Sequence, residues 1–152
     1  MRYYQVNLPN RGGILMYEKV DAVLFSNSSD NYFYDDEFMY VQELISEFAD
    51  IDWGKLVQSL KDRDDKYKIR LVYCIDEDTG MNGFNLLLDL LNENDEVAEY
   101  VIDSLRSFNN EEYKKIIASN KKIMDKTEGL LKNASLPVKR ILETFLQQNK
   151  QS

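Results

Sequence analysis

The sequence predicts an all-α protein: a short stack of antiparallel helical hairpins, with a less regular N-terminal segment. Three observations support this fold class. A set of apolar positions recurs about thirty residues further along the chain, and polar breaks of similar length interrupt both copies. The flanking segments also place apolar residues at helical spacing. The fold is therefore expected to consist of short helices that are stabilised by packing on one another.

The repeat covers the middle of the chain. Its two polar breaks, at 61–66 and 92–96, divide each copy into helix, turn and helix, with helices predicted over 53–60, 67–75, 84–91 and 97–108. Asp95 is expected to cap the last of these. Repeats of this length built from helix pairs are typical of HEAT-like or armadillo-like α-solenoids. The matching apolar positions are Leu56, Leu60, Tyr67, Leu71 and Ile75 in the first copy and Leu86, Leu90, Val97, Val101 and Leu105 in the second.

The segment before the repeat is less regular. Gly12 and Gly13 are expected to form a turn between two apolar-rich pieces, 3–8 and 14–25. A short β-hairpin fits this arrangement, but the spacing of apolar residues favours a helix over about 15–25, followed by a polar loop at 26–30.

A clearer helix is predicted from Asp35 to about Ala49. Asp35 and Asp36 stand where the cap and first turn of a helix favour negative charge. One face of this helix collects its apolar residues, which are Phe38, Val41, Leu44, Ile45 and Phe48.

Two further helices are predicted in the C-terminal third. Ile116, Ile123 and Leu130 recur every seven residues, which indicates one longer amphipathic helix. A loop at 133–135 then separates it from a final helix with Pro137 in its first turn, where proline is tolerated. That last helix is expected to cap the stack, because an open stack exposes an apolar end.

Composition predicts a single domain, residues 1–152, in the cytoplasm. The chain is 43% apolar, which suffices for a core, and it carries a net charge of -8. This acidic balance argues against a nucleic-acid partner, and no apolar run approaches the roughly 20 residues that span a bilayer. The single cysteine, Cys74, and the lack of a signal-peptide core fit a reducing compartment.

Charge is unevenly distributed along the chain. Residues 1–112 hold 24 Asp and Glu against 10 Lys and Arg, a net charge of -14, whereas residues 113–152 hold 3 against 9, a net charge of +6. Such a division can reflect two solvated faces, or it can separate a partner-facing surface from a solvent-facing one.

No motif for catalysis, a metal or a cofactor is present. The chain has no histidine, so the commonest general base and metal ligand is missing. Cys74 lies in an apolar segment and is interpreted as a buried structural thiol. Asp76, Glu77 and Asp78 resemble the start of a calcium loop, but Leu87 occupies the position of the closing glutamate. The chain is therefore predicted to be a binding protein rather than an enzyme.

In style, the chain resembles the all-helical, HEAT-like immunity proteins that are encoded beside contact-dependent growth inhibition and other polymorphic toxins of bacteria. The resemblance rests on the acidic composition, the repeats of 56–75 and 86–105, the clustered loop carboxylates and the missing catalytic set. It implies that the protein binds a toxin C-terminal domain, often a basic nuclease, and covers its active or substrate-binding surface. It transfers no individual site residue.

Under that interpretation, carboxylates compete with the substrate phosphates while tyrosines supply buried contact area. Tyr32, Phe33 and Tyr34 lie beside Asp35, Asp36 and Glu37, and aromatic residues interleaved with carboxylates suit recognition of a basic protein. The carboxylates also fit simple capping and solvation, and the tyrosines fit packing of the N-terminal segment onto the first helix. A helical-repeat adaptor for a non-toxin partner and an acidic-pair metalloenzyme remain alternatives. The predicted partner-binding residues are Asp62, Asp64, Asp65, Asp76, Glu77, Asp78, Glu99, Asp103, Tyr32, Tyr34 and Tyr73.

Overall fold

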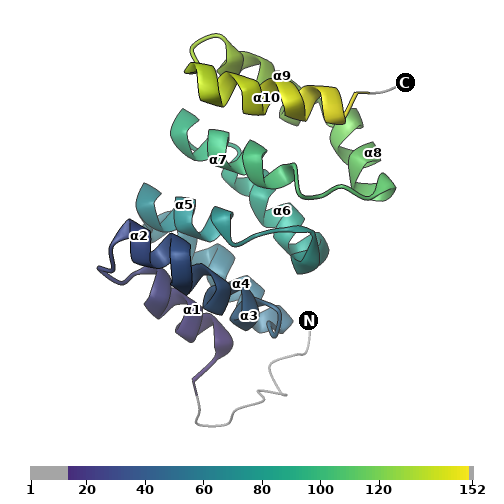
Figure 1. Ribbon diagram of the computed structural model, residues 1–152. Helices are drawn as coiled ribbons and strands as arrows, with labels where there is room; N and C mark the ends of the chain where they lie inside the picture. The colour runs from purple at the N-terminus through teal and green to yellow at the C-terminus, as the bar shows by residue number, and fades with distance from the viewer. Residues whose placement is uncertain (1–13, 151–152) are drawn as a thin grey trace. The chain divides into compact units, whose positions relative to one another are not determined.

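The computed structural model describes residues 14–150, and all regular secondary structure within that range is helical (Figure 1). The all-α prediction is therefore confirmed for these residues. The contacts divide the chain into two compact units, the first ending at Cys74 and the second beginning at Ile75. In the described range, no helix is both long enough and apolar enough to cross a bilayer.

The first unit is organised around its first helix, α1, which packs against α3, α4 and α5. Two fully buried residues of this unit are Val20 of α1 and Leu56 of α4. The elements in chain order are α1 (Met16–Leu24), α2 (Asp30–Tyr32), the π-helical turn η2 (Phe33–Glu37), α3 (Phe38–Ile45), α4 (Asp50–Ser59), the 3₁₀ turn η3 (Leu60–Asp62) and α5 (Asp65–Tyr73).

The second unit is organised around α7, which packs against α6, α9 and α10. Phe84, Phe108 and Tyr113 stack with ring centroids 5.0 to 5.3 Å apart and tie the start of α8 to α6. The elements are the 3₁₀ turn η4 (Glu77–Thr79), α6 (Gly80–Leu90), α7 (Asp95–Leu105), α8 (Glu111–Ser119), α9 (Lys121–Leu131) and α10 (Leu136–Gln148).

Most predicted helices are present, with shifts at their ends. All ten matching positions of the repeat are buried, and Cys74 is a buried thiol as expected. The segment from Met16 to Leu24 is a helix, so the hairpin alternative is wrong for it, whereas residues 3–8 with Gly12 and Gly13 lie outside the described range. Pro137 does stand in the first turn of the last helix.

Three predictions about helix ends are wrong. The helix expected to start at Asp35 begins at Asp30, because the Ser29 side chain accepts a hydrogen bond from the Tyr32 amide and caps it there. Its last residue is Ile45 rather than a position near 49. Asn94, not Asp95, caps α7 by accepting a hydrogen bond from the Val97 amide.

The single longer helix predicted through Ile116, Ile123 and Leu130 is also wrong, because two helices, α8 and α9, meet at Asn120. The backbone of Asn120 is extended, with φ -91° and ψ 103°, and its side chain accepts a hydrogen bond from the Ile123 amide at 3.0 Å. Ile117 and Ile123 are both fully buried. The buried positions on either side of the break are therefore six residues apart rather than seven, because Ile116, the predicted position, is only half-buried.

Candidate functional site

The most distinctive exposed surface of the first unit lies on the helix formed by α2, η2 and α3. It combines aromatic, sulfur-containing and acidic side chains on one side of residues 30–45. Tyr32, Met39 and Tyr40 are 54%, 54% and 50% exposed. We call this surface the acidic–aromatic face, and its residues are Tyr32, Asp35, Asp36, Met39, Tyr40 and Glu43, all of them exposed.

A π-helical turn lies in the middle of this helix. Its defining bond runs from the Phe38 amide to the Phe33 carbonyl, five residues earlier, while the backbone on both sides stays helical. Turns of this kind hold one extra residue and occur frequently at functional sites. Here the turn buries the ring of Phe33 while Asp35 and Asp36 stay exposed.

Arg70 of α5 fixes the start of this helix. Its buried guanidinium donates to the Ser28 carbonyl and to Asp30 Oδ1, each at 2.9 Å, and lies 4.7 Å from the centroid of the Phe33 ring. The hydrogen bond from Arg70 lowers the pKa of the Asp30 carboxyl. The helix that carries the acidic–aromatic face is thereby attached to α5 of the same unit.

A second contact holds the π-helical turn to the preceding loop. The Ser28 hydroxyl donates to Glu37 Oε1 at 2.6 Å and accepts from Arg70 Nη1 at 3.2 Å. Glu37 is half-buried by this network, so its carboxylate is engaged within the fold. Glu37 is therefore not counted in the acidic–aromatic face.

Tyr73, at the end of α5, borders the same face. It is 44% exposed, and its ring stacks edge to face with Tyr34 at 4.7 Å and Phe38 at 5.2 Å between centroids. Tyr34 directly precedes Asp35 in the chain and Phe38 directly precedes Met39, so both rings lie next to residues of the face. The two tyrosines thus extend the aromatic area with rings whose positions are fixed by packing.

The charged residues of this region are all acidic. Residues 20–54 contain nine Asp and Glu and no Lys or Arg. Of the carboxylates on the face, Asp35, Asp36 and Glu43 form no salt bridge with another described residue. The face therefore offers unneutralised negative charge beside exposed aromatic rings, a combination that suits a partner rich in Lys and Arg.

The structure assigns six of the predicted binding residues to the first unit. Tyr32 lies on the acidic–aromatic face, and Tyr34 and Tyr73 border it. The other three lie together in the turn between α4 and α5. Asp62 is exposed at the end of η3, Asp64 caps α5 by accepting from the Tyr67 amide at 3.0 Å, and Asp65 is half-buried in the first turn.

Three of the five predicted residues in the second unit lie at its first turn. Asp76 caps η4 by accepting from the Asp78 amide, and burial raises the pKa of its carboxyl. Glu77 Oε1 accepts from the amides of Asn109 and Asn110 at 2.7 and 3.0 Å. Both carboxylates therefore have structural roles, whereas the side chain of Asp78 is exposed.

The remaining two lie on α7. Glu99 is half-buried, and its pKa is raised by burial and by the nearby charges of Asp95 and Glu96. Asp103 pairs with Arg106 at 2.6 Å and is exposed. The predicted carboxylates therefore differ in how freely they could contact a partner protein. Asp64, Asp76, Glu77 and Asp103 are engaged by contacts within the fold.

The predicted binding residues did not include Met39, Tyr40 or Glu43. The sequence left Asp35 and Asp36 open between capping and, beside Tyr32 and Tyr34, recognition of a basic protein. The signal was present in the continuous acidic run without Lys or Arg. Recognising it required the correct helix start, because a helix that begins at Asp30 places Asp35 and Asp36 beyond the first turn.

Across residues 14–150, no cluster of three or more Cys, Asp and Glu side chains is arranged to hold a metal ion. The Cys74 thiol is buried and donates to the Phe38 carbonyl at 3.8 Å. The described residues therefore define an all-α chain whose most distinctive surface is acidic and aromatic. No protein-family model, curated protein or solved structure matches this chain, so a function can be argued only from its sequence and structure.

Proposed function

We propose that this protein is a bacterial immunity protein that binds a basic toxin domain through the acidic–aromatic face and thereby neutralises it. The observation that supports this proposal is the combination of unpaired Asp35, Asp36 and Glu43 with exposed Tyr32 and Tyr40 on one helix. The partner domain is most simply a nuclease, since nuclease surfaces are electropositive in order to hold phosphates. Covering that surface would exclude the substrate.

In the proposed complex, charge governs the rate of association and contact area provides the affinity. Carboxylates attract a basic partner over long range and accelerate association. Tyrosines supply rigid contact area whose burial provides most of the affinity, and such residues are common among binding hot spots. The stacking of Tyr34, Phe38 and Tyr73 prepares part of this area before binding, which reduces the entropic cost.

The proposal includes a finer description of the fold. The helices are proposed to form a short HEAT-like stack of antiparallel hairpins within a single domain, 1–152, located in the cytoplasm. Support comes from the burial of all ten positions of the thirty-residue repeat, such as Leu56 with Leu86 and Leu71 with Val101. Small-angle X-ray scattering of the purified protein would test this arrangement.

The experiment that tests the function has two stages. A C-terminally tagged protein captures its partner from lysate of the source cells, and mass spectrometry identifies it. The captured toxin domain is then expressed with each variant while growth is measured. The wild type should restore growth, whereas Asp35→Lys with Asp36→Lys should fail, because the reversed charges repel a basic surface.

A matched control reverses two exposed carboxylates of the second unit, Asp89→Lys with Glu128→Lys, and should protect as well as the wild type. A third variant, Asp62→Lys with Asp65→Lys, tests the turn selected from sequence. Protection by the Asp35 and Asp36 variant equal to that of the wild type would contradict the role of the face. Each variant is first shown to melt like the wild type.

A helical-repeat adaptor is the second candidate function, because an acidic–aromatic face suits any basic protein partner. The two functions predict different captured proteins. An immunity protein captures the C-terminal fragment of a secreted toxin and rescues growth, while an adaptor captures a protein whose expression is harmless. The growth assay therefore separates the two functions.

A further inference from the structure

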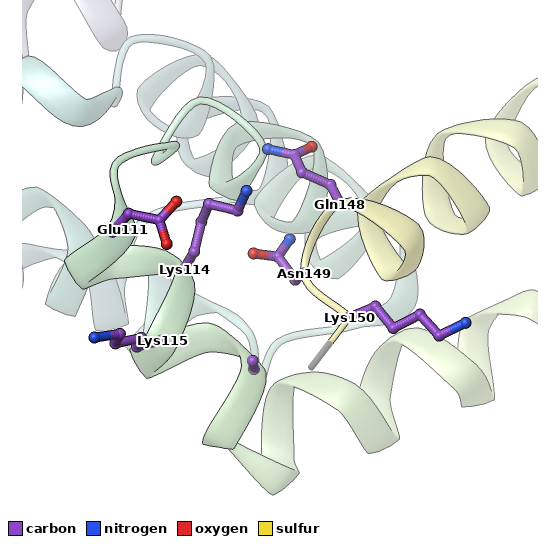
Figure 2. Close-up of a pocket in the computed structure, with 7 residues that line it drawn as sticks. Glu111, Lys114, Lys115, Gln148, Asn149 and Lys150 are labelled. Carbon is purple, nitrogen blue, oxygen red and sulfur yellow. The ribbon is translucent and has the colours of Figure 1, made fainter. Parts of the chain in front are cut away.

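A hollow of about 430 Å³ lies in the second unit, between α8 and the C-terminal end of α10 (Figure 2). This part of the unit is remote in sequence from the acidic–aromatic face and has the opposite charge. The residues that line the hollow are Glu111, Lys114, Lys115 and Ala118 from α8, and Gln148, Asn149 and Lys150 from the end of α10.

The hollow has an excess of positive charge. Three of its lining residues, Lys114, Lys115 and Lys150, face one carboxylate, Glu111. None of the three lysines forms a salt bridge within residues 14–150. Figure 2 shows the Lys114 side chain reaching toward the end of α10, while Lys115 and Lys150 extend away on either side. Lys114 is therefore the cation best placed to contact a bound anion.

A buried acceptor without a donor lies beside these lysines. Asn149 is 2% exposed, and its Nδ2 donates to the Phe145 carbonyl at 3.0 Å, which fixes the orientation of the amide. Its Oδ1 is buried and accepts no hydrogen bond from any residue of the described range. Buried acceptors are nearly always satisfied, so a group that brings a hydroxyl into this hollow would remove a real cost.

A second hollow, of about 600 Å³, adjoins the first and shares Ala118, Asn149 and Lys150 with it. Its lining includes three half-buried apolar residues, Met124, Leu131 and Leu146, contributed by α9 and α10. Glu128 and Glu143 also line it, and their charge opposes an anion there. A cationic compartment thus continues directly into one that combines an apolar strip with two carboxylates and therefore disfavours anions.

We propose that the two hollows together bind an anionic amphiphile, that is, an apolar chain that carries a phosphate or carboxylate head group. The head lies between Lys114 and Asn149, and the chain lies against Met124, Leu131 and Leu146. The singly ionised form of a monoalkyl phosphate, which predominates below its second pKa of about 6, fits better than a carboxylate. Its P–OH group can donate to Asn149 Oδ1 while its other oxygens accept from lysines. This site is independent of the proposed function.

Calorimetric titration of the full chain at about pH 5.5, where the phosphate monoester is singly ionised, tests the site with five probes, each below its micellar concentration or solubility limit. Decyl phosphate should bind most tightly and decanoate more weakly. Inorganic phosphate and 1-decanol should bind at least about tenfold more weakly than decyl phosphate, because each lacks one of the two recognised parts. Shortening decanoate to octanoate should weaken binding about fourfold, as expected for two half-buried methylenes.

Two variants test the assigned residues with decyl phosphate. Lys114→Gln should weaken binding about tenfold, whereas Lys122→Gln, an exposed lysine of α9 outside both hollows, should not change it. Met124→Gln keeps the side-chain length but adds polarity, and it should weaken decyl phosphate without affecting inorganic phosphate. Unchanged melting temperatures would show that the variants are folded.

Each of four outcomes would overturn the proposal. Equal binding of inorganic phosphate and decyl phosphate would mean a bare anion site. Equal binding of 1-decanol would mean non-specific apolar adsorption. Equal effects of the Lys114 and Lys122 substitutions would exclude the assigned head-group site. No measurable binding of any probe would exclude the site altogether.

Discussion

At the scale of single residues, Asp21 joins three parts of the first unit. Its Oδ1 accepts from the Tyr67 hydroxyl at 2.5 Å and from Arg63 Nε at 3.2 Å, while both carboxylate oxygens lie 3.1 Å from Arg63 Nη2. The same guanidinium lies 4.7 Å from the centroid of the Phe25 ring. Burial, followed by the hydrogen bond to Asp21, raises the pKa of Tyr67 well above its ordinary value of 10.0.

This raised pKa predicts a loss of stability in alkali. The folded protein keeps the Tyr67 proton, whereas the unfolded chain releases it above about pH 10. The contribution of Tyr67 to the free energy of unfolding is therefore fully present below about pH 10 and declines above it. The contribution to the slope of the unfolding free energy is about 1.4 kcal/mol per pH unit. Urea unfolding at pH 7, 10, 11 and 11.5 measures that slope.

Tyr67→Phe separates this effect from general alkaline titration. The variant should be less stable at pH 7 by about 1 to 3 kcal/mol, because it removes a buried hydrogen bond to Asp21. Its decline above pH 10 should be shallower than that of the wild type, since lysine titration is common to both proteins. Equal slopes for the two proteins would show that Tyr67 does not cause the alkaline loss.

At the scale of elements, the helix ends depend on short polar side chains. Ser29, Asp64, Asn94, Asn110 and Asn120 each accept a hydrogen bond from the backbone amide three residues later. These caps decide where helices start, and they explain why helix positions were predicted better than helix ends. Sequence patterns locate apolar faces, but several polar residues near each end compete for the capping position.

The break at Asn120 is the most specific of these features. We expect Asn120→Ala to lower the unfolding free energy by about 1 kcal/mol, because the Ile123 amide loses its capping acceptor. For a chain of this length that corresponds to a fall of about 2 to 4 °C in Tm. Asn133→Ala, at an exposed position after α9, is the matched control and should change Tm little. A Tm for Asn120→Ala equal to the control would show that the cap does not stabilise the break.

At the scale of the whole molecule, charge is divided along the chain. The acidic–aromatic face belongs to a stretch, residues 20–54, that holds nine carboxylates and no Lys or Arg of its own, whereas residues 113–152 carry a net charge of +6. The two proposed sites follow this division: the first is expected to bind a basic protein and the second an anionic amphiphile. Net charge governs association and partner sign rather than fold.

This division predicts a strong dependence of partner association on ionic strength. At low salt, Asp35→Lys with Asp36→Lys should slow association with the identified basic partner by about tenfold. The difference should largely disappear at about 1 M salt, where the Debye length is about 3 Å. Stopped-flow measurements of the association rate test this, with Asp89→Lys and Glu128→Lys together as the control. An effect independent of salt would indicate lost contacts rather than lost steering.

The sequence by itself determined the all-helical class, the buried positions of the repeat and the charge division, because helical periodicity and net charge are local properties of the chain. It also placed Tyr32, Tyr34 and Tyr73 among the predicted binding residues. Only the tertiary structure decided that Arg70 anchors residues 28–30, that the helix starts at Asp30, and that Asp35 and Asp36 therefore have no capping role. The Arg70 contacts join residues about forty positions apart, which no local pattern encodes. The start at Asp30 depends on which of several neighbouring polar residues caps the helix, and the local pattern leaves that choice open.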